Sequence, residues 1–297
     1  MRVTFNTNMA DLRGAIATAA QDLAVHQREL STGYKINAPS DDPVGSGAVV
    51  AERSEMAATD QYQASADTAY SRLTVVDSAL SELINRTTAA QSAVLSARGS
   101  TTTAAQREAA ATTIESARDA IVSIMNTKFR GTYLFSGNEP GTAPYERTGD
   151  TISGYQGGDG NVRVDIDRQA SVQVGFSGDD ILKGSSATDL IQTLTDLAAA
   201  ARSHDQDTMT AGNIALDEAF TRLTTAQTRV GNDEAQLDSF KQQLTSRTLA
   251  AKSRLSTIED ADLSQAVTDM NRANVAYQAA LKAVSNASGL SLMDYIK

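Results

Sequence analysis

The fold is decided by residues 263–288, which read LSQAVTDMNRANVAYQAALKAVSNAS. Apolar residues recur in this stretch at alternating spacings of four and three, which is the a/d pattern of a heptad coiled coil. There is no proline or glycine inside it, so we expect one uninterrupted helix. A helix with so narrow an apolar stripe is marginal alone in water and needs a partner helix. Its predicted seam positions are Leu263, Val267, Met270, Asn274, Tyr277, Leu281, Val284 and Ser288.

The start of the chain offers that partner. Apolar positions with the same alternating spacing end at Ser31-Thr32-Gly33, which stops the predicted helix. We expect a hairpin closed by the two ends of the chain, although each stripe could instead pack on copies of itself. The plainer alternative is an ordinary amphipathic helix on a globular core. The positions are Leu12, Ile16, Ala19, Leu23, His26 and Leu30.

These two stripes form the predicted assembly interface. The apolar surface of these helices is only slightly buried in a lone chain and can be buried among neighbouring copies. We therefore expect both helices to be poorly ordered in the free chain and to become ordered on assembly. Asn274 interrupts the C-terminal stripe and is either a residue that sets the helix register or an ordinary asparagine beside solvent.

Composition excludes several classes of function. The chain has 297 residues and a formal net charge of −10, whereas nucleic-acid binding needs a basic surface and an anionic membrane attracts basic clusters. Aromatic residues make up only 5%, which is typical of long helices packed through small side chains. There is no run of about 20 apolar residues for a membrane helix and no apolar region of a cleaved signal peptide. With no cysteine and two histidines, we expect no metal site, no cofactor and no catalysis by these residue types.

The middle of the chain alternates long helical runs with breaks. One helix is expected over about 44–97, with a seam from Leu73 to Val94, and a second carries Ala110, Ile114 and Ile121 on one face. Residues 99–103 separate the two, so they should fold back as an antiparallel pair. Helix resumes near Asp189 and again from Leu216 to Ile258, with a possible kink at Gly231-Asn232.

A small β insertion is expected between these helices, at about 129–187. Eleven of the nineteen glycines lie between Gly131 and Gly184. Residues 162–166 and 172–176 each alternate apolar and polar side chains, as half-buried strands do. The run Gly157-Gly158-Asp159-Gly160-Asn161 predicts a tight hairpin turn before the first strand. The fold class is therefore mainly α with a small β insertion.

Four places carry neighbouring carboxylates that could act in catalysis. Asp165 and Asp167 are spaced to share one face of a strand, and paired carboxylates act in glycosidases. Asp179-Asp180 follows a glycine, and Asp41-Asp42 precedes Pro43, where helix capping competes with an acid/base role. Glu259, Asp260 and Asp262 precede the last helix, where capping explains them better than catalysis. We expect turns, strand surfaces and helix caps rather than an active site.

Several segments resemble the flagellin superfamily. They are residues 30–43, LSTGYKINAPSDDP; residues 129–137, FRGTYLFSG; residues 229–232, RVGN; residues 256–263, STIEDADL; and residues 290–296, LSLMDYI. The ending of the first is closest to the hook–filament junction members of that superfamily. The residues of this motif are Asn37, Pro39, Ser40, Asp41, Asp42 and Pro43.

The resemblance implies a structural subunit of the bacterial flagellum. It implies three domains: 1–34 with 260–297 as a terminal coiled coil, 35–128 with 188–259 as a helical rod, and 129–187 as an outward-facing β domain. It also implies self-assembly into a ring or tube, contacts with a neighbouring hook-associated protein and with flagellin, and export by the flagellar type III apparatus with a secretion chaperone. Asn6-Thr7-Asn8 and Tyr34 are more like flagellin itself, so a small filament-forming flagellin stays the alternative.

Overall fold

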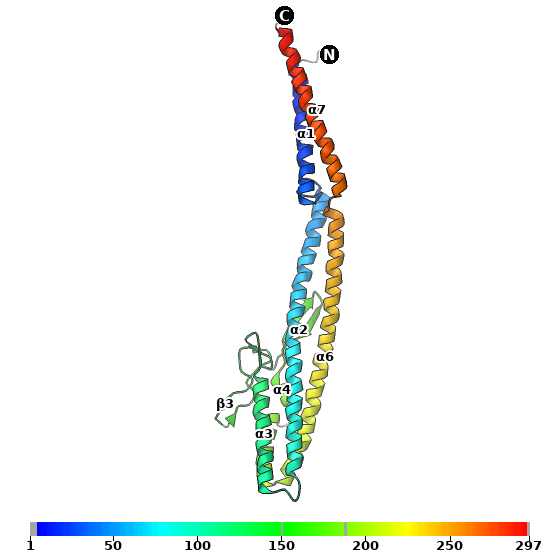
Figure 1. Ribbon diagram of the computed structural model, residues 1–297. Coiled ribbons are helices and arrows are strands. Elements are labelled where there is room, and N and C mark those ends of the chain that lie inside the picture. The colour runs from blue at the N-terminus through cyan, green and yellow to red at the C-terminus, as the bar shows by residue number, and fades with distance from the viewer. Residues whose placement is uncertain (1–4, 150, 187–188, 296–297) are drawn as a thin grey trace. The chain divides into compact units, whose positions relative to one another are not determined.

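The computed structural model describes residues 5–149, 151–186 and 189–295, and it is mainly helical, as predicted (Figure 1). The helices are α1 (Phe5–Thr32), α2 (Pro43–Ala97), α3 (Ala104–Met125), α4 (Gly178–Leu182), α5 (Leu190–Ser203), α6 (Gln206–Glu259) and α7 (Leu263–Tyr295). The strands are β1 (Lys128–Phe129), β2 (Thr132–Tyr133), β3 (Arg147–Thr148), β4 (Thr151–Ile152), β5 (Arg163–Asp167) and β6 (Ala170–Gln173).

The helix boundaries follow from side chains that accept the first free backbone N–H groups. Asp42 Oδ1 accepts from Val44 N at 3.0 Å and Gly45 N at 2.9 Å, directly before Pro43 opens α2. Thr103 and Gln106 form a reciprocal capping box at the start of α3. The same kind of cap precedes α5, where Asp189 accepts from Ile191 N. The run Gly231-Asn232 does not end α6, which continues from Gln206 to Glu259.

Contacts divide the chain into two compact units, one of Met1–Ala58 with Arg247–Lys297 and the other of Thr59–Ser246. The core of the second unit is drawn from α2, α3, α5 and α6. The predicted seam of α2 is confirmed, because all seven of its positions are 0% exposed, namely Leu73, Val76, Leu80, Leu83, Thr87, Ala90 and Val94. On α6, four side chains spaced seven residues apart are also fully buried, namely Leu216, Leu223, Val230 and Leu237.

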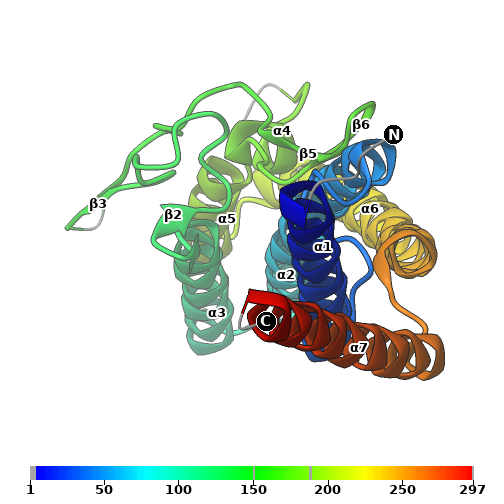
Figure 2. The same ribbon diagram turned by 90° about the horizontal axis from the view of Figure 1, so that it is seen from above.

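Among the described residues, the strands of the β insertion form three separate two-stranded hairpins, β1–β2, β3–β4 and β5–β6. It packs on the helices, because Leu134, Phe135, Ile166 and Val172 belong to the same hydrophobic cluster as the helical core. Figure 2 shows the insertion beside α3 and α5. The three-domain division stays a prediction.

The predicted hairpin turn at Gly157–Asn161 is wrong. No pair of described strands is joined there; the segment is a loop that packs closely on residues 136–139. A Cβ at Gly158 would lie 1.7 Å from Asn138 Oδ1, and one at Gly137 would lie 1.8 Å from Gly158 O. Gly137 therefore permits close approach of two backbones, and Gly158 leaves room for the Asn138 side chain, roles that the turn prediction did not consider.

Candidate assembly interface

The terminal helices α1 and α7 pack against each other within the first unit (Figure 1). The hairpin closed by the chain's own ends is therefore confirmed. Its contact is shallow, because none of the described side chains of α1, residues 9–32, is fully buried. The six predicted positions from Leu12 to Leu30 are all half-buried and lie on one face. The role of these positions in assembly stays a prediction.

The buried face of α7 is rotated relative to the predicted seam. Ala266 is 5% exposed and Ala273 is 8% exposed, and they recur with half-buried residues at spacings of four and three. We call this face the inner seam: Ala266, Met270, Ala273, Tyr277, Ala280 and Val284. Three of these positions, Met270, Tyr277 and Val284, belong to the predicted seam.

The other predicted positions of α7 lie on a second face. We call it the outer stripe, and it consists of Leu263, Val267, Asn274 and Leu281. Leu263 is 54% exposed, Val267 40% and Leu281 43%. Asn274 is exposed as well, and its Oδ1 accepts a hydrogen bond from Gln278 Nε2 at 3.2 Å. Ser288 lies outside the described side chains.

The motif at 37–43 is built around two carboxylates that bind backbone. Asp41 Oδ2 accepts from Asn37 N at 3.0 Å and from Ala38 N at 2.8 Å. Asp41 N in turn donates to Ala38 O, which closes a turn with Pro39 at its second position and Ser40 at its third. Because Asp42 caps α2, both aspartates serve the local backbone, and the capping explanation holds for Asp42.

Residues 33–35, just before this motif, are tied to the segment that connects α6 to α7. Ala261 N donates to Gly33 O at 2.8 Å, and Lys35 N donates to Glu259 O at 2.7 Å. The backbones of Tyr34 and Asp260 form an isolated antiparallel bridge. These pairings hold the connection between α1 and α2 beside the connection between α6 and α7.

Two of the three carboxylates before α7, Asp262 and Glu259, have different roles. Asp262 caps the helix, since its Oδ1 accepts from Ser264 N and Gln265 N. Glu259 is 5% exposed and pairs with Arg53 Nη2 at 2.8 Å, so capping does not explain it. Sequence spacing alone could not show this, because Arg53 lies 206 residues away.

The acidic pairs of the insertion lie on a strand with a register shift and in a short helix. A register shift separates Asp165, which pairs with Ser171, from Asp167, which pairs with Ala170. Asp179 and Asp180 lie in the first turn of the short helix α4. Among the described residues, no three His, Cys, Asp or Glu side chains are grouped closely enough to hold a metal ion.

One buried polar pair was missed in the sequence. Tyr145 is 1% exposed, and its Oη donates to Asp189 Oδ2 at 3.0 Å. Burial raises the pKa of the Asp189 carboxyl, and burial beside that carboxyl raises the pKa of the Tyr145 hydroxyl. Since Asp189 also caps α5, the pair fastens the insertion to the helices.

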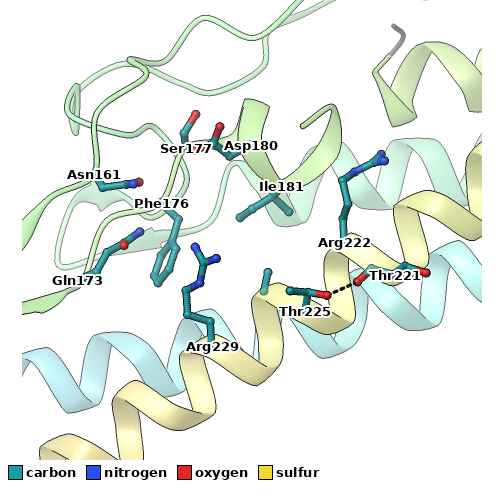
Figure 3. Close-up of a pocket in the computed structure, with 11 residues that line it drawn as sticks. Asn161, Gln173, Phe176, Ser177, Asp180, Ile181, Thr221, Arg222, Thr225 and Arg229 are labelled. Atoms are coloured by element: carbon teal, nitrogen blue, oxygen red, sulfur yellow. Dashed lines mark hydrogen bonds between the residues drawn. The ribbon is translucent and has the colours of Figure 1, made fainter. Parts of the chain in front are cut away.

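A pocket of about 250 Å³ lies between α4 and α6 in the second unit (Figure 3). Phe176, Ile181 and Ala226 supply apolar surface, while Asp180 and Arg229 are exposed at its edge. Figure 3 shows the Arg229 side chain directed toward Phe176. Neither histidine lies among its lining residues, so Ser177 has no imidazole beside it to act as a base.

No described helix has the length and apolar character needed to cross a membrane.

Comparison with known proteins decides the family. Residues 4–139 match the model of the bacterial flagellin N-terminal helical region, and residues 214–296 match that of the bacterial flagellin C-terminal helical region. Together the two matches span more than half of the chain. The chain belongs to the flagellin superfamily. The resemblance read from the sequence motifs is thereby confirmed.

Two curated relatives are hook-associated proteins. Flagellar hook-associated protein 3 of Escherichia coli (strain K12) is 26% identical over 319 residues, covering 99% of both chains. Its Salmonella typhimurium counterpart is 23% identical over 287 residues, covering 89% of this chain and 90% of the relative. The family and these relatives support a structural role in the bacterial flagellum.

Solved structures show the same fold. A putative flagellar hook-associated protein from Vibrio parahaemolyticus superposes with a TM-score of 0.69 at 20% identity, covering 74% of this chain and 100% of that one. FlgL from Xanthomonas campestris gives a TM-score of 0.63 at 16% identity, covering 69% of this chain and 99% of that one.

Proposed function

We propose that the chain is the structural subunit that joins the flagellar hook to the filament. It assembles through its terminal helices into a ring or tube, works outside the cell and catalyses no reaction. Its neighbours are another hook-associated protein on one side and flagellin on the other. It reaches the site through the flagellar type III export apparatus with a secretion chaperone, and it takes no cofactor and binds neither nucleic acid nor membrane.

The observation that supports this proposal most is the outer stripe of α7. Leu263, Val267 and Leu281 are between 40% and 54% exposed, although they sit on a helix that already has a partner. A helix with two apolar faces can pack on α1 through one and on a neighbouring copy through the other. The predicted interface residues thus divide between an inner seam that closes the hairpin and an outer stripe that recruits copies.

The three-domain arrangement belongs to the same proposal. The terminal coiled coil lines the inside of the assembly, the helices of 35–128 and 188–259 surround it, and the insertion of 129–187 faces outward. Asn274, exposed within the outer stripe, is proposed to set the register between copies, because one polar residue in an apolar seam penalises shifted pairings.

A small filament-forming flagellin is the second candidate, favoured by Asn6-Thr7-Asn8 and by Tyr34. Immuno-electron microscopy of intact flagella separates the two. A narrow band of label at the distal end of the hook is expected for a junction subunit. Label along the whole filament would refute the junction role and favour flagellin.

A further inference from the structure

A groove of about 460 Å³ runs between α2 and the β insertion, within the second unit. Phe129, Val162 and Val164, which are half-buried, give it apolar walls together with alanines of α2. The only charged residues among those lining it are Arg72 and Arg130. The groove is therefore apolar and positively charged, with no carboxylate of its own.

Among the described residues, Arg72 bonds to carbonyl and hydroxyl oxygens and has no acidic partner. Its Nε donates to Val174 O at 2.6 Å, Nη1 to Thr132 Oγ1 at 3.1 Å and Nη2 to Tyr133 O at 3.2 Å. These acceptors satisfy its hydrogen bonds but leave its charge unbalanced. Burial lowers the pKa of this guanidinium, which nevertheless stays charged because arginine titrates far above neutrality.

Arg130 occupies a backbone conformation that disfavours arginine. Arg130 and Gly131 form the two-residue turn between β1 and β2, and both have positive φ, 48° and 87°. Such turns favour asparagine or aspartate followed by glycine, because a long side chain with positive φ is strained. The Arg130 guanidinium lies 5.4 Å from the centre of the Phe129 ring, at the rim of the groove. Strain kept at such a position indicates a use for the side chain beyond the turn.

We propose that this groove binds a segment of a second copy of the chain, one that presents apolar side chains and a carboxylate to Arg130 and Arg72. The inference rests on the proposed self-assembly. The chain carries 36 acidic against 26 basic residues, so a neighbouring copy supplies carboxylates readily. A polyanion such as nucleic acid would need a broad basic surface, and this chain has a net charge of −10.

The test exploits the strain at the turn. Arg130→Asn removes the charge and places a favoured residue in the turn, so the purified subunit should melt at a higher temperature. In cells lacking the native gene, the same variant should lower the number of complete filaments by about tenfold, the scale of one lost charge pair at an interface. Arg130→Lys keeps the charge and should restore most of the assembly. Arg168→Asn, in the turn between β5 and β6 and outside the groove, is a control for the loss of one positive charge and should assemble normally.

Photo-crosslinking identifies the occupant. With Thr68→p-benzoylphenylalanine at the groove, irradiated flagella should yield a covalent dimer whose cross-linked peptide contains Asp or Glu. Cross-links to a different protein, no cross-link from assembled flagella, or normal filament numbers with Arg130→Asn would each overturn the groove proposal. The self-assembly proposal has a separate readout, because it fails only if Leu281→Asp in the outer stripe assembles normally.

Discussion

Replacing Leu281 by aspartate should abolish assembly while leaving the free subunit folded. Leu281 is 43% exposed on the outer stripe, outside the inner seam that holds α7 to α1. In the lone chain the new carboxylate stays in water, so the cost is the lower helix propensity of aspartate, about 0.5 kcal/mol. Circular dichroism of the purified variant should therefore match that of the native protein.

In the assembly the same change acts on a buried position. Fully burying a leucine is worth about 1.5–3 kcal/mol, so covering the part that is still exposed contributes about 1 kcal/mol per copy. An unpaired carboxylate in that place costs several kcal/mol more, because desolvation of the charge is not repaid. The cost of burying the new carboxylate therefore exceeds the loss of apolar contact, and this cost applies to every copy in the ring or tube.

Leu281→Ala is the matched control, since it removes the same apolar surface without adding charge. It should reduce assembly by about tenfold at most, because 1.4 kcal/mol corresponds to a factor of ten. The assay counts complete filaments per cell by electron microscopy and measures unassembled subunit in the medium. Normal filaments with Leu281→Asp, or loss of helical signal in its free subunit, would refute the reasoning.

Three further predictions follow from the contacts of single residues. Asp42→Ala should lower the free energy of unfolding of the first unit by about 1 kcal/mol, whereas Asp42→Asn keeps the cap and most of the stability; chemical denaturation of both variants checks this. Tyr145→Phe should destabilise the second unit by about 1–3 kcal/mol in the same assay, because Asp189 loses a hydrogen-bond donor in a buried place, and an unchanged midpoint would contradict it. Burial raises the folded pKa of Asp189 above its unfolded value near 3.8, so its contribution to stability is present at low pH and is lost as pH rises through the folded pKa. Asp189→Asn removes this titration and should flatten that part of the curve of unfolding free energy against pH. A curve parallel to that of the native protein would exclude Asp189 as the cause.

The depth to which the seam residues are buried explains which seams could be predicted from the sequence. On α2 the large apolar residues and the buried positions coincide, so counting threes and fours from Leu73 found the whole seam. On α7 the helix carries two apolar faces, and the leucines Leu263 and Leu281 are on the exposed one. Heptad spacing fits both faces, so the predicted seam combined Met270, Tyr277 and Val284 of the inner seam with positions of the outer stripe. Alanines hold the most buried positions of the inner seam, because small side chains let two backbones approach closely.

The insertion was predictable only in part for a different reason. Strand β5 nearly coincides with the first alternating segment, 162–166, whereas β6 overlaps the second, 172–176, only at residues 172–173. The long-range pairs, such as Glu259 with Arg53 and Tyr145 with Asp189, left no local signal. The close contacts of the glycines near Asn138 could not be predicted from the sequence, because they depend on a loop elsewhere in the chain.

The seams of α2 and α6 are buried more deeply than the inner seam of α7, which indicates that the second unit folds by itself and that the terminal helices depend on assembly. In the second unit, α2 and α6 bury leucine and valine completely at successive heptad positions, so that unit has a deep core of its own. In the first unit, α7 fully buries only Ala266 and Ala273 among its described side chains, and each alanine removes little apolar surface from water. The hairpin of α1 and α7 is therefore weakly held by its own contacts, and most of the apolar surface that could stabilise it is still on the outer stripe. Hydrogen exchange of the free subunit should accordingly be fast in both terminal helices and slow in the α2 seam, and equal protection in the two would mean that the terminal helices need no neighbours.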